Sequence, residues 1–579
     1  MNVSGKHRIK FAQFEADLAT GELFENGSRV QIQQKPFHIL ALLLQRAGQL
    51  VTRQELHEKL WPSTFVQKDL SLNTAMRKLR LALGETGRTR QFIETVGSRG
   101  YRFVAPVSIP ESLANAQLPS RQRVRLAVLP FENLGKEDSE YFSDGLTEQL
   151  IALMGRAHRG VSVIAPVSSM QYKRTSKPTA QIGHELRADY ILGGSVLLDG
   201  ARVRVTAKLI RCADQTVVWS DSFSRDERDI FLIQEGITRQ ISRSMLKAIP
   251  GLTEGNASAH TTSSGTYQKF LKACYFGHKW TEPAFRRAID YFEQVIAEDP
   301  GYVPALGCYA YMYAAMAQYG GMDPNATYEL VRSYASRAVE IDPDYDYALV
   351  SLAQYHIFHS LEWRAAEAIL QRTLTINPSF ALAYTTYGQL LTLMQRSSES
   401  VAMVRRAADL DPASPVSRAL VACAEYFAGQ YAEAQLNVSE ALEMDPNFPT
   451  SLTVLGWISE AEGQIGAASA AYERAAGLAP QSGLMLAHHA RGLALAGRKD
   501  EASKVLDSVL ALRRQAYVPS YAISLAYLAI GNREEAFRWL MAAFDEKCPW
   551  RVFCGVDPKF RPLYGDPRFE SLRKCLELP

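Results

Sequence analysis

Dipeptides that end in proline recur through the C-terminal half of this chain at nearly constant spacing. The prolines are Pro300, Pro343, Pro378, Pro412, Pro446 and Pro480, at intervals of 43, 35, 34, 34 and 34 residues. Each follows Asp, Asn or Ala and separates apolar stretches with helical spacing, and proline cannot continue a helix. A period of 34 residues fits two antiparallel helices with their turns. This half of the chain is therefore predicted to be an all-α array of stacked helix pairs.

Positions inside the repeat agree with this prediction. In the unit that ends at Pro480, the small residues Gly456, Ala468 and Ala475 and the large Tyr472 stand where two antiparallel helices would touch. This pattern resembles the tetratricopeptide repeat. The resemblance implies a solenoid over residues 265–546 with about eight helix pairs, an irregular pair near residues 320–324, and a capping segment at 547–579. Such arrays present a concave surface to peptides, domains or small ligands.

Tyrosines are frequent in the predicted array and have two interpretations. They could line the concave groove, or they could fill core positions of the repeats, which is the interpretation that we favour. They are Tyr309, Tyr313, Tyr345, Tyr347, Tyr384 and Tyr387. His488 and His489 are likewise interpreted as surface or packing residues rather than metal ligands.

The opposite end of the chain is basic. Residues 1–107 contain 16 Lys and Arg against 9 Asp and Glu, which gives +7, whereas the remainder contains 48 against 52, which gives −4. A basic segment on a slightly acidic body indicates that only this segment meets a polyanion.

Residues 68–83, KDLSLNTAMRKLRLAL, predict a helix with one apolar and one basic face. Leu72, Met76, Leu79 and Leu83 have the spacing of a buried stripe. The basic residues fall off this stripe and are expected to face outward, and an α-helix of this width fits the DNA major groove. A hairpin with a basic tip, residues 92–103, follows this helix. We interpret the pair as a DNA-reading helix with a wing.

The order of elements in residues 1–107 points to a known domain. Short strands over 11–30, a helix over 35–46 and a helix with a Thr52–Glu55 capping box precede the basic helix. The strings QQKPFHILALLLQRAGQLVTRQELHEKLW, MRKLRLAL and ETVGSRGYRF resemble the winged helix-turn-helix domain of OmpR/PhoB-type response regulators and ToxR/CadC-like activators. The resemblance implies that the basic helix enters the major groove of double-stranded DNA and that the wing touches the minor groove or backbone.

The predicted DNA contacts combine the basic helix and the wing. They are Asn73, Thr74, Arg77, Lys78, Arg80, Ser98, Arg99 and Arg102. An alternative is open for the arginines of the helix, because Arg77 or Arg80 could pair with Glu94 or Glu85 on the surface. Tyr101 and Phe103 are interpreted as hairpin core rather than as base-stacking groups.

A linker over residues 108–122 leads to a middle segment, residues 123–250, in which predicted strands and helices alternate. The strings LAVLPFENLGKEDSEYFSDGLTEQLI, ADYILGGSV and VRVTAKLI resemble the TolB/FlgO-like α/β domain, which supplies no catalytic residues to transfer. Ser143 and Asp144 are interpreted as a helix cap rather than a nucleophile. Gly193 and Gly194 lack the pattern of a phosphate loop. A second linker is predicted over residues 251–264.

Several function classes lack support in the sequence. The seven cysteines are scattered without metal-ligand spacing, which predicts free thiols in a reducing compartment. We find no signal-peptide pattern and no stretch of about 18 apolar residues. We therefore expect a cytoplasmic protein without a membrane span, metal, cofactor or catalytic site.

The predicted fold class is a multidomain α+β chain: a winged helix-turn-helix, then an α/β TolB-like domain, then an all-α tetratricopeptide solenoid. The predicted function is a one-component bacterial transcriptional regulator that binds DNA sequence-specifically. Its repeats would act as a sensor or as an interaction module for RNA polymerase, another protein or a ligand, and copies could associate on DNA. An interaction scaffold with weak DNA anchoring is the alternative, and a cyclase-like enzyme is a third hypothesis.

Overall fold

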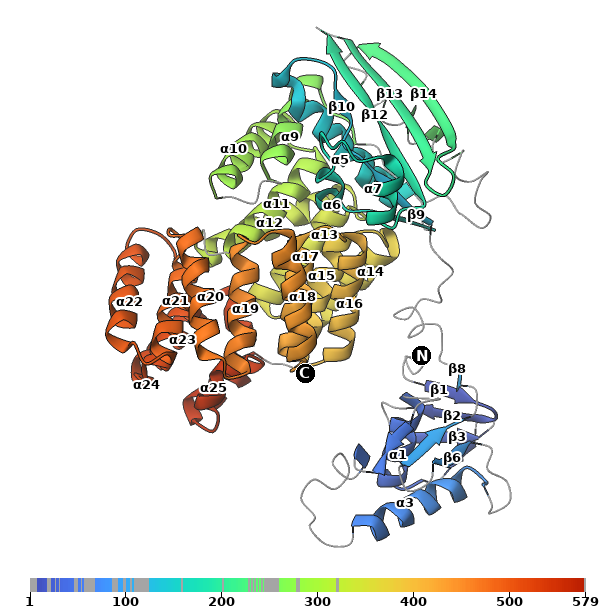
Figure 1. The fold of residues 1–579 in the computed structure, drawn as a ribbon, viewed down its shortest axis with the longest axis vertical. Coiled ribbons are helices and arrows are strands. Elements are labelled where there is room, and N and C mark those ends of the chain that lie inside the picture. The colour runs from blue at the N-terminus through green and yellow to red at the C-terminus, as the bar shows by residue number, and fades with distance from the viewer. Residues whose placement is uncertain are drawn as a thin grey trace. The chain divides into compact units, whose positions relative to one another are not determined.

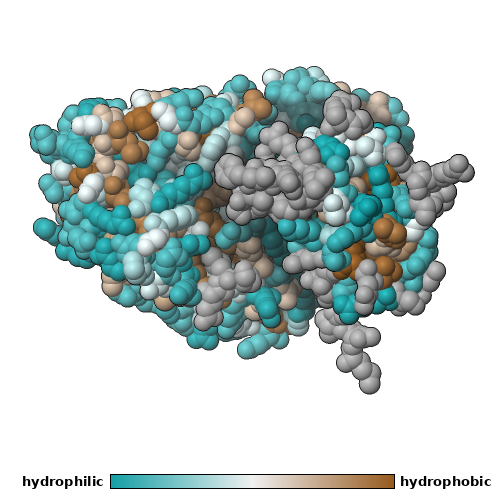
Figure 2. All heavy atoms as spheres, turned by 90° about the horizontal axis from the view of Figure 1, so that it is seen from below, coloured by the Kyte–Doolittle hydropathy of each residue, from teal (hydrophilic) through white to brown (hydrophobic). Residues whose placement is uncertain are grey.

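The computed structural model divides the chain into two compact units, Met1–Gln122 and Arg123–Pro579 (Figure 1). The residues that the structure describes are 8–17, 22–25, 28–30, 32–45, 50–53, 55–56, 68–85, 92–96, 100–104, 107–108, 124–157, 160–199, 202–226, 260–277, 282–318 and 322–576, with isolated positions between 230 and 243. Hydrophilic side chains cover most of the face seen in Figure 2, and its hydrophobic patches are small and separate.

Within its described residues, the first unit contains two antiparallel sheets and the helices α1 and α3. The elements are β1 (Arg8–Phe11), β2 (Phe14–Asp17), β3 (Glu22–Glu25), β4 (Ser28–Val30), α1 (Gln34–Gln45), β5 (Leu50–Thr52), α3 (Lys68–Ala82), β6 (Ile93–Val96), β7 (Gly100–Phe103) and β8 (Val107–Ser108). One sheet has the order β4-β3-β2-β1-β8 and the other β5-β7-β6. The short strands, the first helix, the basic helix and the hairpin predicted from the sequence are all present.

One apolar core joins these elements. Leu72, Met76, Leu79 and Leu83 of the α3 region are buried against the apolar side chains of α1. The four predicted inward residues of α1, Phe37, Leu40, Leu43 and Leu44, are buried in the same core. The helical spacing read from the sequence therefore identified the buried faces of both helices.

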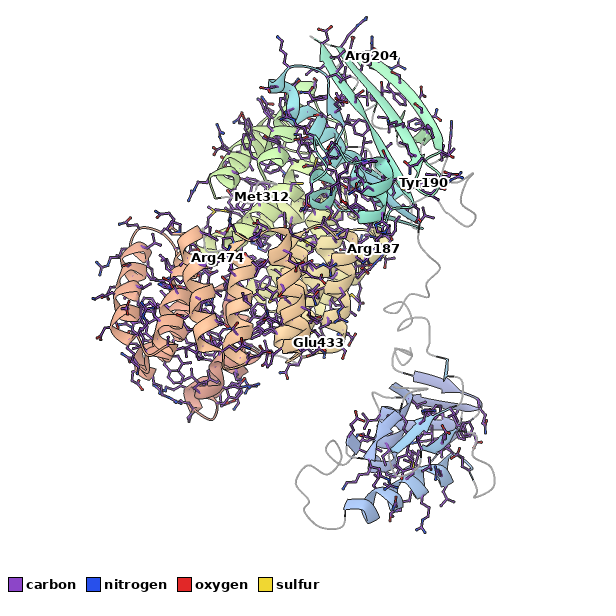
Figure 3. The ribbon with its side chains drawn as sticks, in the orientation of Figure 1. Arg187, Tyr190, Arg204, Met312, Glu433 and Arg474 are labelled. Atoms are coloured by element: carbon purple, nitrogen blue, oxygen red, sulfur yellow. The ribbon has the colours of Figure 1, made fainter. Side chains whose placement is uncertain are left out.

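The middle segment is a mixed sheet with helices on both faces. Its elements are β9 (Val124–Val128), β10 (Glu132–Asn133), α5 (Glu140–Ala157), β11 (Val161–Val163), α6 (Pro166–Met170), α7 (Thr179–Glu185), β12 (Tyr190–Asp199), β13 (Arg202–Arg211) and β14 (Val217–Asp226). The strand order is β11-β9-β12-β13-β14, with β10 beside β12. Tyr190 and Arg204 mark opposite ends of the long hairpin (Figure 3). A helix that the sequence predicts at the end of this segment, up to Met245, lies almost entirely outside the described residues.

Alternation along β9 explains why both faces are covered. Leu126 and Val128 join the core cluster of α5, whereas Ala127 between them joins the cluster of α7. Gly194 of β12 belongs to this packing, because a Cβ there would lie 1.9 Å from the carbonyl oxygen of Thr206 on β13. Neither Gly193 nor Gly194 opens a helix, since both lie inside a strand.

The array contains eight helix pairs within the described residues. They are α9 (Ser264–Gly277), α10 (Glu282–Glu298), α11 (Val303–Gln318), α12 (Pro324–Ile341), α13 (Asp346–Tyr355), α14 (Trp363–Ile376), α15 (Ala381–Leu393), α16 (Ser397–Leu410), α17 (Pro415–Phe427), α18 (Tyr431–Met444), α19 (Pro449–Ala461), α20 (Ile465–Leu478), α21 (Gly483–Leu495), α22 (Lys499–Arg513), α23 (Ser520–Ile530) and α24 (Arg533–Asp545). A π-helical turn, η3 (His356–Ser360), extends α13. The number of pairs agrees with the prediction.

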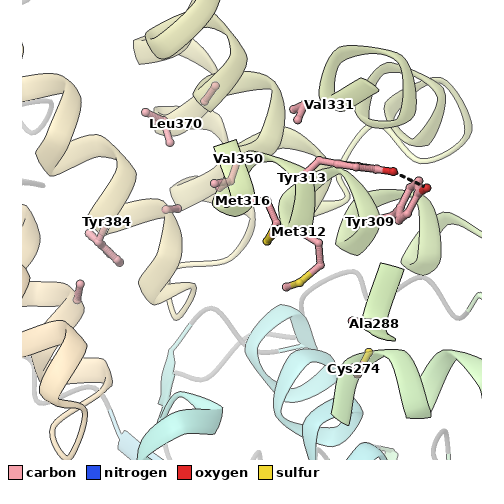
Figure 4. Close-up of a cluster of buried hydrophobic side chains, with 14 of the residues drawn as sticks. Cys274, Ala288, Tyr309, Met312, Tyr313, Met316, Val331, Val350, Leu370 and Tyr384 are labelled. Atoms are coloured by element: carbon pink, nitrogen blue, oxygen red, sulfur yellow. Dashed lines mark hydrogen bonds between the residues drawn. The ribbon is translucent and has the colours of Figure 1, made fainter. Parts of the chain in front are cut away.

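The internal packing of the repeat agrees as well. A Cβ at Gly456 would lie 2.2 Å from the ring of Tyr472, so the glycine lets this ring fill the space between α19 and α20. Tyr309 and Tyr313 are buried and share a hydrogen bond of 2.9 Å between their hydroxyl groups (Figure 4). Tyr345, Tyr384 and Tyr387 are also buried. The tyrosines are thus mostly core residues, as the favoured interpretation expected.

The tail, residues 547–579, crosses the first helices of the repeats instead of only covering the last one. It contains η4 (Pro549–Gly555), η5 (Pro558–Leu563) and α25 (Pro567–Lys574). The indole nitrogen of Trp550 donates to the carbonyl of Gln318 at 2.8 Å, and Arg551 donates to the carbonyl of Phe358 at 2.6 Å. Since these partners end α11 and follow α13, the tail fills part of the surface that the resemblance assigns to ligands.

The middle segment docks on loops of the array. The carboxylate of Asp411 accepts hydrogen bonds from the backbone N–H of Ser168 at 3.0 Å and from its hydroxyl group at 2.6 Å. The N–H of Val163 donates to the hydroxyl oxygen of Ser379 at 3.1 Å. Asp411 precedes Pro412, and Ser379 follows Pro378. The same proline-containing loops that define the repeat therefore hold the middle segment.

Candidate nucleic-acid interface

The outer face of α3 is set by the stripe that it buries. Asn73, Thr74, Arg77 and Lys78 fall between the buried positions and are exposed. Because side chains three and four residues apart share a face of a helix, Asn73, Thr74, Arg77 and Lys78 form one polar surface beside the core stripe. Four of the predicted contact residues are thus brought together on one helix.

Arg77 and Lys78 differ in their surroundings. Among the described residues, Arg77 has no hydrogen bond or ion pair, so its guanidinium keeps all its donors available. Lys78 donates from Nζ to Oε1 of Gln33 at 2.9 Å in an exposed contact. An exposed bond of this kind is readily exchanged for a phosphate or a base.

Arg80 was predicted to face outward, and this prediction is wrong. Its guanidinium donates to the carbonyl of Ile93 at 3.2 Å and to the hydroxyl of Thr95 at 2.8 Å, and it lies 3.5 Å from a carboxylate oxygen of Glu85. The side chain is only 22% exposed. Arg80 follows Leu79, a residue of the buried stripe, and its side chain contacts the hairpin, so it joins α3 to β6. The alternative pairing of Arg80 with Glu85 is what the structure shows.

The two wing strands, β6 and β7, bury side chains on one face and make polar contacts on the other. Tyr101 and Phe103 are buried, which confirms their interpretation as hairpin core. Arg102 is half-exposed and lies 3.4 Å from a carboxylate oxygen of Glu94 on the paired strand. Ser98 and Arg99, the predicted contacts at the tip, lie outside the described residues.

The sequence interpretation missed Arg53. Its guanidinium donates to Oδ1 of Asn73 at 3.0 Å and to the hydroxyl of Tyr101 at 3.0 Å, and it lies 5.4 Å from the centre of the Tyr101 ring. The predicted capping box is present beside it, because Thr52 and Glu55 exchange hydrogen bonds of 2.8 and 3.2 Å. Arg53 therefore joins the start of one helix, the outer face of α3 and the wing. The feature of the sequence that could have identified Arg53 is its place as a basic residue directly after the helix cap Thr52.

Other residues singled out in the sequence have structural surroundings. Helix α5 begins at Glu140, so Ser143 and Asp144 lie inside it and neither caps it as predicted. Asp144 instead lies 2.6 Å from the ammonium group of Lys173. His488, interpreted from the sequence as a surface or packing residue, is buried against the ring of Tyr472.

The described residues bear on two further classes of function, metal binding and membrane insertion. No group of three or more His, Cys, Asp or Glu side chains there could hold a metal ion. None of the helices described is long and apolar enough to cross a membrane. The seven cysteines are free thiols.

Three family models match separate parts of the chain. Residues 27–103 match the model described as transcriptional regulatory protein, C terminal. Residues 122–240 match the second domain of HilA/YgeH-like transcriptional regulators, and residues 449–482 match the tetratricopeptide repeat. The first unit thus carries the OmpR/PhoB-type regulator domain, and the C-terminal array contains tetratricopeptide repeats, as the sequence resemblances implied.

Similarity to transcriptional regulators covers more of the chain than the family models do. Transcriptional regulator HilA of Salmonella typhimurium is 24% identical over 393 residues, which cover 68% of each chain. Putative adenylate cyclase 3 of Rhizobium meliloti is 29% identical over 191 residues, 33% of this chain and 32% of that protein. The DNA-binding domain of Klebsiella pneumoniae RstA, solved with the RstA box, is 28% identical with a TM-score of 0.16 and covers 17% of this chain and 96% of that one. This chain is therefore similar over two thirds of its length to a transcriptional regulator.

Proposed function

We propose that the protein regulates transcription by binding DNA sequence-specifically through α3. The observation that carries this proposal is the exposed face of Asn73, Thr74, Arg77 and Lys78 on a helix whose opposite stripe is buried. Arg and Lys reach guanine O6 and N7 in the major groove, and Asn reads adenine. The match of residues 27–103 to a regulator domain supports the same function.

The wing and Arg53 would position α3 on the duplex. Arg102 is half-exposed beside Glu94, and Arg53 holds Asn73 against the wing. Contacts to phosphates fix register without carrying sequence information. We propose that Arg99 and Ser98 add contacts at the wing tip, that copies bind side by side on direct repeats, and that the repeats or the middle segment reach RNA polymerase or another protein.

The location of the tail limits the surface of the array that a protein partner can contact. Trp550 and Arg551 occupy positions against the inner helices that a peptide partner would otherwise contact. We therefore favour the array as a sensor joined to the middle segment over the scaffold hypothesis. Protein partners would then bind faces that the tail leaves open.

The middle segment is proposed to be TolB/FlgO-like and to regulate rather than catalyse. Its support is the three strings that resemble that domain and the match of residues 122–240 to the second domain of HilA/YgeH-like regulators. One relative is named a putative adenylate cyclase. Turnover of a nucleoside triphosphate by the purified chain would contradict this part of the proposal.

The test is in vitro selection of random DNA by the full chain at fixed near-physiological salt, followed by binding measurements on the enriched sequence. Arg77→Ala is expected to weaken binding and to relax the preference at one base by about 1–3 kcal/mol. The control is Arg204→Ala, which removes an exposed arginine of the second unit (Figure 3). Failure to enrich a motif, or unchanged binding by Arg77→Ala with Lys78→Ala, would overturn the proposal.

A further inference from the structure

A cavity lies where the middle segment meets the array. It measures about 250 Å³ and is lined by residues of α5 and the start of α6 on one side and by the inner helices of the repeats on the other. Ile151 and Val167 contribute to the first wall, and Cys274, Met312 and Leu420 to the second. Cys274 and Met312 are labelled in Figure 4. The cavity belongs to one compact unit, so both walls are fixed by the docking contacts described above.

The walls are mostly apolar, and their size suits a small molecule. Tyr311, Tyr345, Tyr347 and Phe380 add aromatic surface to the aliphatic side chains. Ligand sites in proteins are typically concave, apolar and aromatic, with a few polar groups that fix orientation. The volume of the cavity, about 250 Å³, is just below the range of about 300–1,000 Å³ that is usual for such sites, so a small ligand would suit it.

Two polar groups of the lining have no partner. Oε1 of Gln354 on α13 and Oγ1 of Thr386 on α15 are buried, and no hydrogen bond reaches either atom within the described part of the chain. The two residues are 5% and 0% exposed. A buried polar atom without a partner costs about 1–3 kcal/mol, so a native cavity that keeps two of them favours an occupant that bonds to them. An amide oxygen accepts, so the occupant must carry a hydrogen-bond donor.

The charges of the lining select against anions. Glu148, Asp346 and Asp411 line the cavity, whereas the described lining contains no Lys, Arg or His. The carboxylate of Asp346 accepts from the amide of Asn377 at 2.8 Å and from the N–H of Tyr347 at 3.0 Å, so it is already held by the protein. A buried negative charge on a ligand would find no cationic partner in this wall.

We propose that this cavity binds a mostly apolar small molecule that carries a hydrogen-bond donor and no negative charge. Such a ligand contacts α5 and α6 of the middle segment together with α9, α11, α13, α15 and α17 of the array. It therefore stabilises the docking of one on the other, because a ligand that binds only the docked form shifts the equilibrium toward it. This makes the junction of the two parts the sensing site.

Three indoles that differ in charge test the proposal on the full chain. Indole-3-ethanol is neutral, tryptamine is cationic and indole-3-acetate is anionic, and ligand-detected NMR titration measures each affinity. The neutral and cationic probes are expected to bind with a Kd of about 1 mM or tighter, as their size allows. Indole-3-acetate is expected to bind at least tenfold more weakly, because it places a charge in an unpaired site.

Two variants locate the binding. Ala152→Phe fills the cavity from α5 and is expected to abolish binding, whereas Ala432→Phe places the same side chain on an exposed position of α18 and leaves it unchanged. Thr386→Val keeps the shape of the lining and is expected to weaken the binding of indole-3-ethanol severalfold. Thermal unfolding confirms that each variant is folded. Absence of binding by all three probes, equal binding of the anion, or full binding by Ala152→Phe would overturn the proposal. DNA binding is measured separately, so failure of the DNA-binding function is recognised independently.

Discussion

At the residue scale, two arginines of α3, Arg77 and Arg80, have different structural roles. Arg77 is exposed and unpaired within the described residues, whereas Arg80 is bonded to two groups of β6 and lies beside the buried Glu85. The sequence pattern assigned both to DNA because helical spacing gives a direction but not a partner. The hairpin residues that accept from Arg80 are 13 and 15 positions further along the chain, beyond the reach of helical spacing, so only the fold shows its role.

The two arginines are therefore expected to respond differently to truncation. Arg80→Ala should lower the free energy of unfolding of the first unit by about 1–3 kcal/mol, because it leaves two acceptors of β6 without their donor and removes the ion pair with Glu85. Arg77→Ala should change this free energy by less than about 0.5 kcal/mol while weakening DNA binding. Urea unfolding and DNA titration of both variants make the comparison. Equal stability of Arg80→Ala and wild type would contradict the structural role.

His488 gives the array a dependence on pH. Burial lowers the pKa of this imidazole from 6.5 to about 3, with Lys559 and Arg491 acting in the same direction. Between pH 6.5 and about pH 3, His488 is therefore protonated in the unfolded chain and neutral in the folded chain. The free energy of unfolding falls as the pH falls through this window. The slope from one such group approaches about 1.4 kcal/mol per pH unit.

His488→Phe should flatten this dependence. Phenylalanine keeps a ring beside Tyr472 and Trp457 and removes the titrating group. The apparent free energy of unfolding, measured from pH 6.5 to pH 4 for wild type and variant, is expected to diverge toward the acid end. His184→Phe, at an exposed position of α7, serves as the matched control and should retain the wild-type slope. Parallel curves for His488→Phe and wild type would show that this histidine does not control the dependence.

At the element scale, the long amphipathic helices and the short strands of the first unit were predicted, whereas two very short elements of the middle segment were missed. α1, α3 and the repeat helices are long enough to repeat their apolar spacing several times. α6 has five residues and β10 has two, so neither contains a full period. α5 begins at Glu140, ahead of Ser143 and Asp144, which were predicted to cap it.

The repeat helices depend on glycine at one close approach. Gly456→Ala should destabilise the array by about 1–3 kcal/mol, since the new Cβ would lie 2.2 Å from the ring of Tyr472. Gly477→Ala in α20 meets nothing within 4 Å and should be neutral or stabilising by up to about 1 kcal/mol. Thermal unfolding of the two variants makes the comparison. A neutral Gly456→Ala would mean that the ring of Tyr472 relaxes without cost.

At the scale of the whole molecule, the tail and the middle segment convert a repeat array into one compact unit. Arg551 is buried and donates to the carbonyls of Phe358 and His359, which lie in the π-helical turn after α13. Asp411 and Ser379 hold the middle segment through loops between repeats. Each contact joins residues separated by more than 190 positions in the chain.

Removing the tail contact should loosen the inner helices. Arg551→Ala leaves two buried carbonyls without their donor and is expected to cost about 2–4 kcal/mol. Hydrogen exchange in α11 and α13 should accelerate accordingly, whereas Arg561→Ala, at an exposed position of the same tail, should leave it unchanged. Wild-type protection in Arg551→Ala would indicate that other tail contacts suffice.

The sequence by itself determined the order of elements, the buried faces of α1 and α3, the tetratricopeptide period and the basic outer face of α3. These follow from periodicity and composition, which are local properties of the chain. The tertiary structure alone decided that Arg80 turns inward, that Arg53 joins α3 to the wing, that the tail lies against the inner helices, and that a cavity forms at the junction with the middle segment. The reason is that each depends on groups far apart in sequence, whose proximity is set by packing and not by spacing.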